Sequence, residues 1–381
     1  MKKLSIFIFT MLFLLLTSTS SFALEDPLSK SNNFVGIHVL FQSELEQAAT
    51  LVNSSGGEWG YVTIPIQTVD RDMEKWQAFM DQAKKLKVIP LVRIATQPDP
   101  ANTAVWSKPT DYDLIDFANF LSALSWPTKN KYVILFNEVN RSDEWGGTPP
   151  SPTEYAQIVI SAHDIFKSRD QDFYLILGGM DAAAPNDYVK YISGLTYLSQ
   201  LLENPKVVQS IDGFSSHSYP NPAFSAPPSE TKPVSVATYR FEYDMINNNA
   251  PKKLPAFITE TGWSDKTLSA STISQYYEIT FNDIWNKDKD KIVAITPFLL
   301  TAGHPFDVFS FFKDGKEKEY YKTLFSLSKE KGKPSITANT ATIASSDETV
   351  LGAKSFEQGE QTTNLVSPFA KLYIKTILGL N

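Results

Sequence analysis

Eight short apolar segments recur along the chain, and each ends in polar or glycine-containing residues. Most are continuous apolar runs, which is typical of strands that are buried on both faces. In chain order they are FVGIHVL (34–40), WGYVTIP (59–65), VIPLVRI (88–94), YVILFNE (132–138), FYLILGG (173–179), IDGFSSHSY (211–219), PAFITETGW (255–263) and IVAITPFLL (292–300). The pattern therefore predicts eight buried strands.

Segments with helical periodicity lie between these strands. They include DMEKWQAFMDQAKKL (72–86), TEYAQIVISAHDIFKS (153–168), which begins with a threonine cap after Pro152, and ASTISQYYEITFNDIWN (270–286). Eight strand–helix units predict an α/β fold of the (β/α)8 (TIM) barrel type. A doubly wound open sheet is the alternative. It normally carries a glycine-rich phosphate turn after its first strand, and IHVLFQSE (37–44) has none.

The first residues have the pattern of a secretory signal. A basic start (residues 2–3) precedes a short apolar run (6–16) and the small residues of Ser-Phe-Ala (21–23). We expect cleavage after Ala23 and a secreted or extracytoplasmic mature protein without a transmembrane segment. A membrane anchor is the alternative, but the apolar run is shorter than the roughly 20 residues that a spanning helix needs.

The amino-acid composition of the sequence changes near residue 330. Residues 24–330 are predicted to form the barrel domain, and residues 331–381 a polar linker-like segment with a short C-terminal helix. The stretch 333–361 is rich in Ser, Thr, Ala and Glu, and is either a flexible linker or a loosely packed cover on the barrel. SPFAKLYIKTILGLN (367–381) predicts a helix that docks on the barrel, with contact to a membrane surface as the alternative.

Composition narrows the classes of function. The net charge is −7 and no Lys/Arg-rich run follows residue 3, so nucleic acid is not an expected partner. The chain has no Cys, its 4 His are scattered and it lacks an HExxH motif, which argues against a metal hydrolase. The strand ends carry no Lys for a Schiff base, and the GxSxG elbow of serine hydrolases is missing. We expect neither a metal nor a cofactor.

Two carboxylates directly follow buried strands. Glu138, preceded by Asn137, ends the fourth predicted strand, and Glu260 ends the seventh. Active sites of such barrels lie at the C-terminal ends of the strands, and strands three steps apart in a ring of eight face one another across its mouth. Two carboxylates placed in this way can flank one glycosidic bond, as glycoside hydrolysis requires.

The strand ends FNE and ITETGW, with SSHSYP between them, resemble those of the clan A glycoside hydrolases. Members of this clan are retaining (β/α)8 enzymes that act on β-linked polysaccharides or oligosaccharides, and the resemblance covers about residues 34–325. It implies that Glu138 is the acid/base, that Asn137 binds the sugar 2-hydroxyl and that Glu260 is the nucleophile.

The same resemblance implies that His217 and Tyr219, after the sixth strand, contact the nucleophile or the sugar. The H-x-Y-P arrangement is similar to β-xylosidase-like members, whereas the TGW after Glu260 is similar to β-1,3-glucanase members. The family within the clan therefore stays open.

The sequence departs from the clan pattern at two places. Many members carry an Arg near the nucleophile on the second strand, whereas the candidate here is Arg93 after the third. Many carry a Trp after strand eight as the floor of the sugar site. PFLLTAGHPFDVFSFF (297–312) has none and offers Phe298, His304, Phe306 and Phe309 instead.

Further substrate-binding candidates are His38 at the first strand end, Trp145 in the polar NRSDEWGG loop, where we expect an exposed ring, and Trp263. Asp143 or Glu144 in the same loop could bind sugar hydroxyls or rival Glu138 as the acid.

Structural roles remain possible for the other candidates as well. Asn137 could cap a turn and His217 could be a satisfied core residue. Glu138 could pair with Arg141, and Glu260 with Arg93.

The function predicted from sequence is therefore a secreted, retaining β-glycoside hydrolase. The alternative is a secreted barrel that binds carbohydrate without hydrolysing it. The sugar, the linkage, endo or exo action and the oligomeric state are left open.

Overall fold

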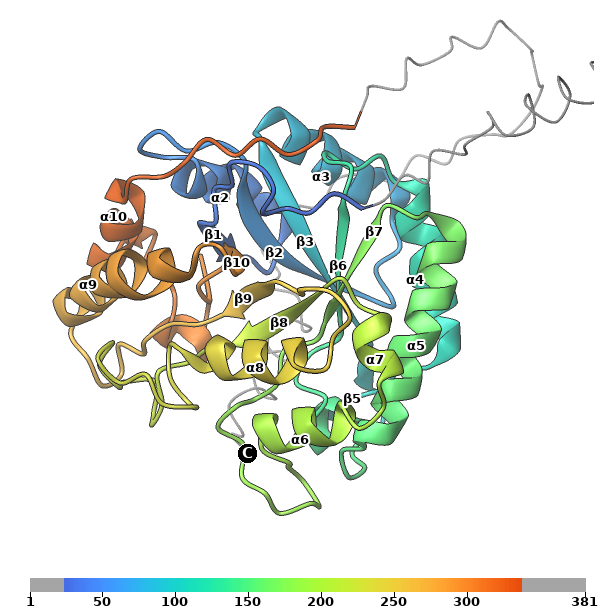
Figure 1. The fold of residues 1–381 in the computed structure, drawn as a ribbon. Helices are drawn as coiled ribbons and strands as arrows, with labels where there is room; N and C mark the ends of the chain where they lie inside the picture. Colours follow the sequence, from blue (N-terminus) through green and yellow to red (C-terminus); the bar gives the residue numbers. More distant parts are fainter. Residues whose placement is uncertain (1–23, 338–381) are drawn as a thin grey trace, which may run out of the picture.

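Eight parallel strands surround a common axis in the computed structural model, which describes residues 24–337 (Figure 1). Their order follows the sequence, and a bridge between Val35 and Ile295 joins the first strand to the last. The strands are β1 (Gly36–His38), β2 (Gly60–Gln67), β3 (Val88–Ala95), β6 (Lys131–Leu135), β7 (Phe173–Leu177), β8 (Gly213–His217), β9 (Ala256–Glu260) and β10 (Ile292–Ile295). The predicted (β/α)8 barrel and all eight predicted strands are confirmed.

Helices lie between successive strands and cover the outside of the barrel (Figure 1). They are α2 (Leu45–Val52), α3 (Met73–Lys85), α4 (Asp111–Ala123), α5 (Pro152–Arg169), α6 (Gly194–Leu201), α7 (Lys206–Gln209), α8 (Thr238–Asn247), α9 (Ala270–Ile279) and α10 (Glu319–Ser326). The hairpins β4 (Pro98–Asp99)–β5 (Asn102–Trp106) and β11 (Phe312–Lys313)–β12 (Lys316–Glu317) lie in the connections. Within residues 24–337, no helix combines the length and the apolar character needed to cross a lipid bilayer.

The third predicted helix continues beyond α9 in a different geometry. A π-helical turn (Thr280–Trp285) and a 3-10 turn (Asn286–Asp288) complete the segment. The second predicted helix begins two residues earlier than expected, because Ser151 and not Thr153 is its cap. The Ser151 hydroxyl accepts the Glu154 N–H and Pro152 occupies the first helical turn, where its missing N–H costs nothing.

The interior of the barrel changes character from one end to the other. Because strand side chains alternate, Ile89, Leu91 and Arg93 of β3 all point inwards. Near the N-terminal end of the barrel, aromatic and aliphatic side chains pack around the axis. A hydroxyl pair between Thr63 and Thr296 lies nearer the C-terminal end. Strand alternation therefore carries Arg93 into the barrel mouth.

Both ends of the described chain cover the N-terminal end of the barrel. Leu24 and Leu28 pack against the inner apolar cluster. Residues 331–337 cross beside them, with bridges from Lys331 to Glu58 and from Ile336 to Thr128. The predicted signal peptide and the predicted C-terminal helix lie outside the described residues.

Replacing the cap of α5 should weaken the fold measurably. We expect Ser151→Ala to lower the free energy of unfolding by about 1 kcal/mol, because the Glu154 N–H loses its acceptor. Thr153→Ala, at an exposed position two residues on, is the matched control and should change it by less than about 0.5 kcal/mol. Urea denaturation of both variants measures the difference. An equal loss in the two variants would contradict the placement of the cap.

Candidate active site

Seven of the predicted site residues gather at the C-terminal end of the barrel. His38, His217 and Glu260 are the last residues of β1, β8 and β9, so strand geometry alone places them there. The complete set is His38, Arg93, Asn137, Glu138, His217, Tyr219 and Glu260, and Tyr219 is half-buried whereas the others are buried.

Asn137 and Glu138 stand on a sharp turn that follows β6. The strand ladder stops at Leu135, and both Phe136 (φ 66°) and Glu138 (φ 37°) adopt left-handed backbone conformations. Such conformations are costly for residues other than glycine and persist where the surroundings hold them. Here the Glu138 N–H donates to the Gly179 carbonyl at 2.9 Å, which ties the turn to the end of β7.

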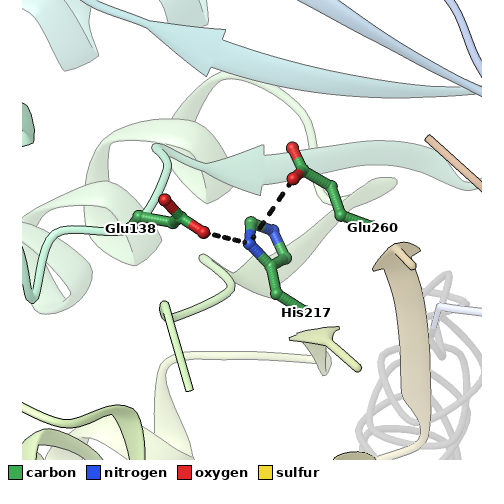
Figure 2. A group of neighbouring side chains, drawn as sticks. All are labelled: Glu138, His217 and Glu260. Atoms are coloured by element: carbon green, nitrogen blue, oxygen red, sulfur yellow. Dashed lines mark hydrogen bonds and ion pairs between the residues drawn. The ribbon is translucent and has the colours of Figure 1, made fainter. Parts of the chain in front are cut away.

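Glu138, His217 and Glu260 form one cluster (Figure 2). His217 Nδ1 lies 2.9 Å from Glu138 Oε1 and 3.7 Å from Glu260 Oε2, and the three ligand atoms lie within 4.8 Å of one another. Burial disfavours the imidazolium, but the two carboxylates outweigh it and raise the pKa of His217. Among the described residues, this trio of nitrogen and oxygen donors is also the one compact enough to hold a divalent cation.

Glu260 is held as a carboxylate by several partners. Arg93 donates to Oε1 at 2.5 Å and the Tyr219 hydroxyl donates to Oε2 at 3.1 Å. Burial alone would raise the pKa of Glu260, but His217 and Arg93 lower it to about 2. Glu260 is therefore ionised at neutral pH, and Arg93 reaches it from β3.

Asn137 links this cluster to Glu144. Its amide oxygen accepts a hydrogen bond from Arg93 at 2.7 Å, and its amide nitrogen donates to Glu144 at 3.2 Å. Burial, together with the nearby carboxylates of Asp143 and Glu138, raises the pKa of Glu144 to about 8. The orientation of the Asn137 amide is thus fixed from both sides.

His38 lies against the cluster without carrying charge. It is fully buried, its ring meets Phe298 edge-on at 5.1 Å, and its Nδ1 is 3.8 Å from Glu260. Burial and the positive charge of Arg93 lower the pKa of His38 to about 3. We conclude that a neutral His38 packs beside Glu260.

Two tryptophans predicted to bind substrate are core residues instead, and those predictions are wrong. Trp145 is fully buried: its ring packs edge-on against Tyr155 and its indole N–H donates to Glu154. The polar residues around it in the sequence had indicated an exposed ring, but the loop turns Trp145 inwards against α5. Trp263 packs against Tyr277, and its indole N–H donates to the Ala226 carbonyl.

A cleft of about 340 Å³ opens over Glu138 and Glu260. Phe298, Phe306 and Phe309 line it in the region where the clan pattern has a tryptophan, whereas the side chain of His304 is 84% exposed. The full lining is Glu138, Arg141, Asp181, Ala182, Ala183, Ala184, Pro185, Tyr191, His217, Tyr219, Asn221, Phe224, Glu260, Phe298, Phe306 and Phe309.

The sequence named Arg141 as a possible partner of Glu138, but it did not single out Asp181, which lies beside both. Arg141 lies 3.1 Å from Asp181 and 3.7 Å from Glu138, and its other nitrogens bind Asp143. Burial and the Glu138 carboxylate raise the pKa of Asp181 to about 6. The sequence contains one signal for Asp181, because this carboxylate follows soon after the fifth predicted strand. The loop around it has no recognised motif.

At the level of sequence, no known protein family and no curated protein matches the chain. Solved structures match its fold at low identity. A family 39 glycoside hydrolase from Bacteroides cellulosilyticus WH2 has a TM-score of 0.55 and 15% identity, over 80% of this chain and 64% of its own. A monomeric β-xylosidase from Caulobacter crescentus CB15 has a TM-score of 0.55 and 15% identity, over 78% of this chain and 69% of its own.

A GH5_18 protein from Bifidobacterium longum subsp. infantis has a TM-score of 0.52 and 11% identity, over 77% of this chain and 78% of its own. The chain thus spans less than two thirds of the Bacteroides structure and about two thirds to three quarters of the other two. These likenesses show that the barrel fold is shared.

Gly179 should be essential for the position of His217. A methyl group on Gly179 would overlap the Cδ2–Nε2 edge of the His217 ring, so Gly179→Ala must displace the imidazole from the position in which its Nδ1 hydrogen-bonds Glu138. We expect the pKa of His217 to fall, because the ring leaves the carboxylates that raise it. Histidine NMR across a pH titration measures the shift.

Gly303→Ala is the control for this substitution, because an added Cβ there meets nothing within 4 Å. Gly303→Ala should leave the pKa of His217 unchanged. A folded Gly179→Ala variant with an unchanged His217 titration would contradict the packing described here.

Proposed function

We propose that the protein is a secreted, retaining β-glycoside hydrolase in which Glu260 is the nucleophile and Glu138 the acid/base. The observation that carries the proposal is the close approach of these two buried carboxylates, whose ligand oxygens lie within 4.8 Å. Retaining glycosidases hold their carboxyl groups about 5–5.5 Å apart, whereas inverting enzymes need about 6.5–9.5 Å to admit a water. The short separation favours the covalent route.

The environment of Glu260 suits nucleophilic attack. It is ionised, and Arg93 and Tyr219 orient its two oxygens. In the first step a Glu260 oxygen bonds to the anomeric carbon as the glycosidic C–O bond breaks, and Glu138 gives its proton to the leaving oxygen. In the second step Glu138 takes a proton from water, and that water's oxygen displaces Glu260 from the sugar.

The surrounding side chains support these steps. His217 Nδ1 hydrogen-bonds Glu138, so it can exchange a proton with the acid/base, and as an imidazolium it also stabilises the Glu260 carboxylate 3.7 Å away. The amide nitrogen of Asn137 donates to Glu144, and the second hydrogen of the same NH2 group can donate to a sugar hydroxyl. This agrees with the role that the clan resemblance implies for Asn137.

Comparisons and sequence add further support. A family 39 glycoside hydrolase and a β-xylosidase are among the structures that share the barrel. Export is proposed from the basic start, apolar run and small residues of the first 23 positions. The second candidate function is a barrel that binds carbohydrate without cleaving it. It is favoured by the lack of a tryptophan in residues 297–312. A test for hydrolysis distinguishes the two candidate functions.

Removing the charge of Glu260 should abolish hydrolysis. We expect Glu260→Gln to reduce kcat to less than about one thousandth on any β-linked polysaccharide or aryl β-glycoside that the mature protein cleaves. Gln is chosen because Ala would remove a buried partner of Arg93 and cost stability. Initial rates on a panel of such substrates provide the measurement.

Glu44→Gln is the matched control, since Glu44 is another buried glutamate at the same barrel end, bonded to the Leu40 and Phe41 N–H groups. It should keep its activity. Full activity in a folded Glu260→Gln variant would refute the nucleophile assignment, and binding without turnover in the wild type would favour the non-hydrolytic barrel.

The acid role of Glu138 should show in its dependence on the leaving group. Glu138→Ala should slow substrates with poor leaving groups by about 10²–10⁴-fold, because those need protonation. Substrates with a 4-nitrophenol leaving group should lose much less in the first step. Rates for a series of aryl glycosides of one sugar test this, and equal losses along the series would argue against an acid role.

A further inference from the structure

The two proposed catalytic carboxylates divide the cleft into walls of different chemistry. On the Glu260 side, Tyr219 donates to the carboxylate, and its ring packs with those of Phe224 and Phe309 at 5.1 and 6.0 Å. On the Glu138 side the lining includes the charged and polar side chains of Arg141, Asp181 and Tyr191, beside the small apolar residues 182–185. An aromatic wall therefore faces a polar one across the scissile position.

The roles of the carboxylates give this division a direction. The acid protonates the leaving oxygen and the nucleophile bonds to the retained sugar. The leaving group must therefore lie on the Glu138 side, against the polar wall.

The polar wall presents groups that suit sugar hydroxyls. The side chain of Asp181 is 22% exposed, and its carboxylate accepts from Arg141 at one oxygen and from the Ala183 N–H at the other. A carboxylate has about four lone-pair positions, so both oxygens can accept further hydrogen bonds. Tyr191 is half-buried and lines the cleft, and the Arg141 guanidinium lies over its ring, 5.7 Å from the ring centre.

Buried Asn140 holds the polar wall in place. Its amide nitrogen donates to the carbonyls of Asp181 and Ile192, and its amide oxygen accepts the Asp181 N–H. It thereby closes the two ends of the long loop that follows β7. Because the backbone at Asp181 is already fixed, less conformational freedom is lost when a ligand binds there.

We propose that Asp181, Arg141 and Tyr191 form a subsite for a hydroxyl-rich sugar as the leaving group. The natural substrate is then an oligosaccharide or polysaccharide and not the glycoside of a small alcohol or phenol. This inference rests on the proposed function, because it takes Glu138 as the acid.

Two substrates with the same retained sugar but different leaving groups can distinguish binding of the leaving group from its protonation. A methyl glycoside needs the acid but has no sugar on the leaving side, whereas a disaccharide or longer oligosaccharide needs both. We expect Asp181→Ala to lower kcat/KM for the oligosaccharide about tenfold more than for the methyl glycoside, because a hydrogen bond to a charged group is lost only there.

Asp143→Ala is the matched control. Asp143 is also a carboxylate partner of Arg141, but it is not part of the cleft lining. Asp143→Ala should change kcat/KM by the same factor for both substrates. If Asp181→Ala also lowers both equally, the subsite is refuted and Asp181 only positions Arg141.

A binding measurement keeps this inference separate from the proposed function. In a Glu260→Gln background, which should not turn over, titration calorimetry with the oligosaccharide should show about tenfold weaker binding on adding Asp181→Ala. Unchanged affinity would overturn the subsite. Weakened affinity, together with a wild type that cleaves nothing, would support the sugar-binding wall and refute the hydrolase.

Discussion

The buried charge of Glu260 is the constraint around which the barrel mouth is built. A carboxylate with 2% exposure would cost several kcal/mol without partners. Arg93 from β3, Tyr219 from the loop after β8 and His217 from β8 supply the compensation. Because these partners come from different strands, the charge is balanced only when the barrel closes. The same closure brings Glu138 to the cluster, so the folding requirement and the proposed chemistry coincide.

The turn after β6 connects the proposed acid to the proposed leaving-group wall. Glu138 is tied to Gly179 through its own N–H, and two residues later Asn140 binds both ends of the loop that follows β7. One short stretch thus sets the acid carboxylate and the position of Asp181. The strain of the left-handed residues is offset by these bonds, which leave the turn little freedom to relax.

The shared fold at 11–15% identity is compatible with changes at the mouth. The clan pattern places an arginine on the second strand, whereas Arg93 reaches Glu260 from the third. Phe298 lines the cleft in the segment where the clan pattern has a tryptophan. All strand ends converge on one mouth, so a charge or a ring can be supplied from a neighbouring strand without altering the barrel.

The barrel could be predicted from the sequence, because continuous apolar runs and helical periodicity are local properties that report burial directly. The sequence also identified most of the residues around Glu260, since a polar residue at the end of a buried strand must lie at the mouth. The surroundings of the loop residues could be seen only in the folded chain. The fold buries Trp145 and Trp263, which the composition of their loops could not reveal, and it sets Asp181 beside Arg141. Loop conformation depends on contacts between distant segments, and those contacts exist only once the barrel has formed.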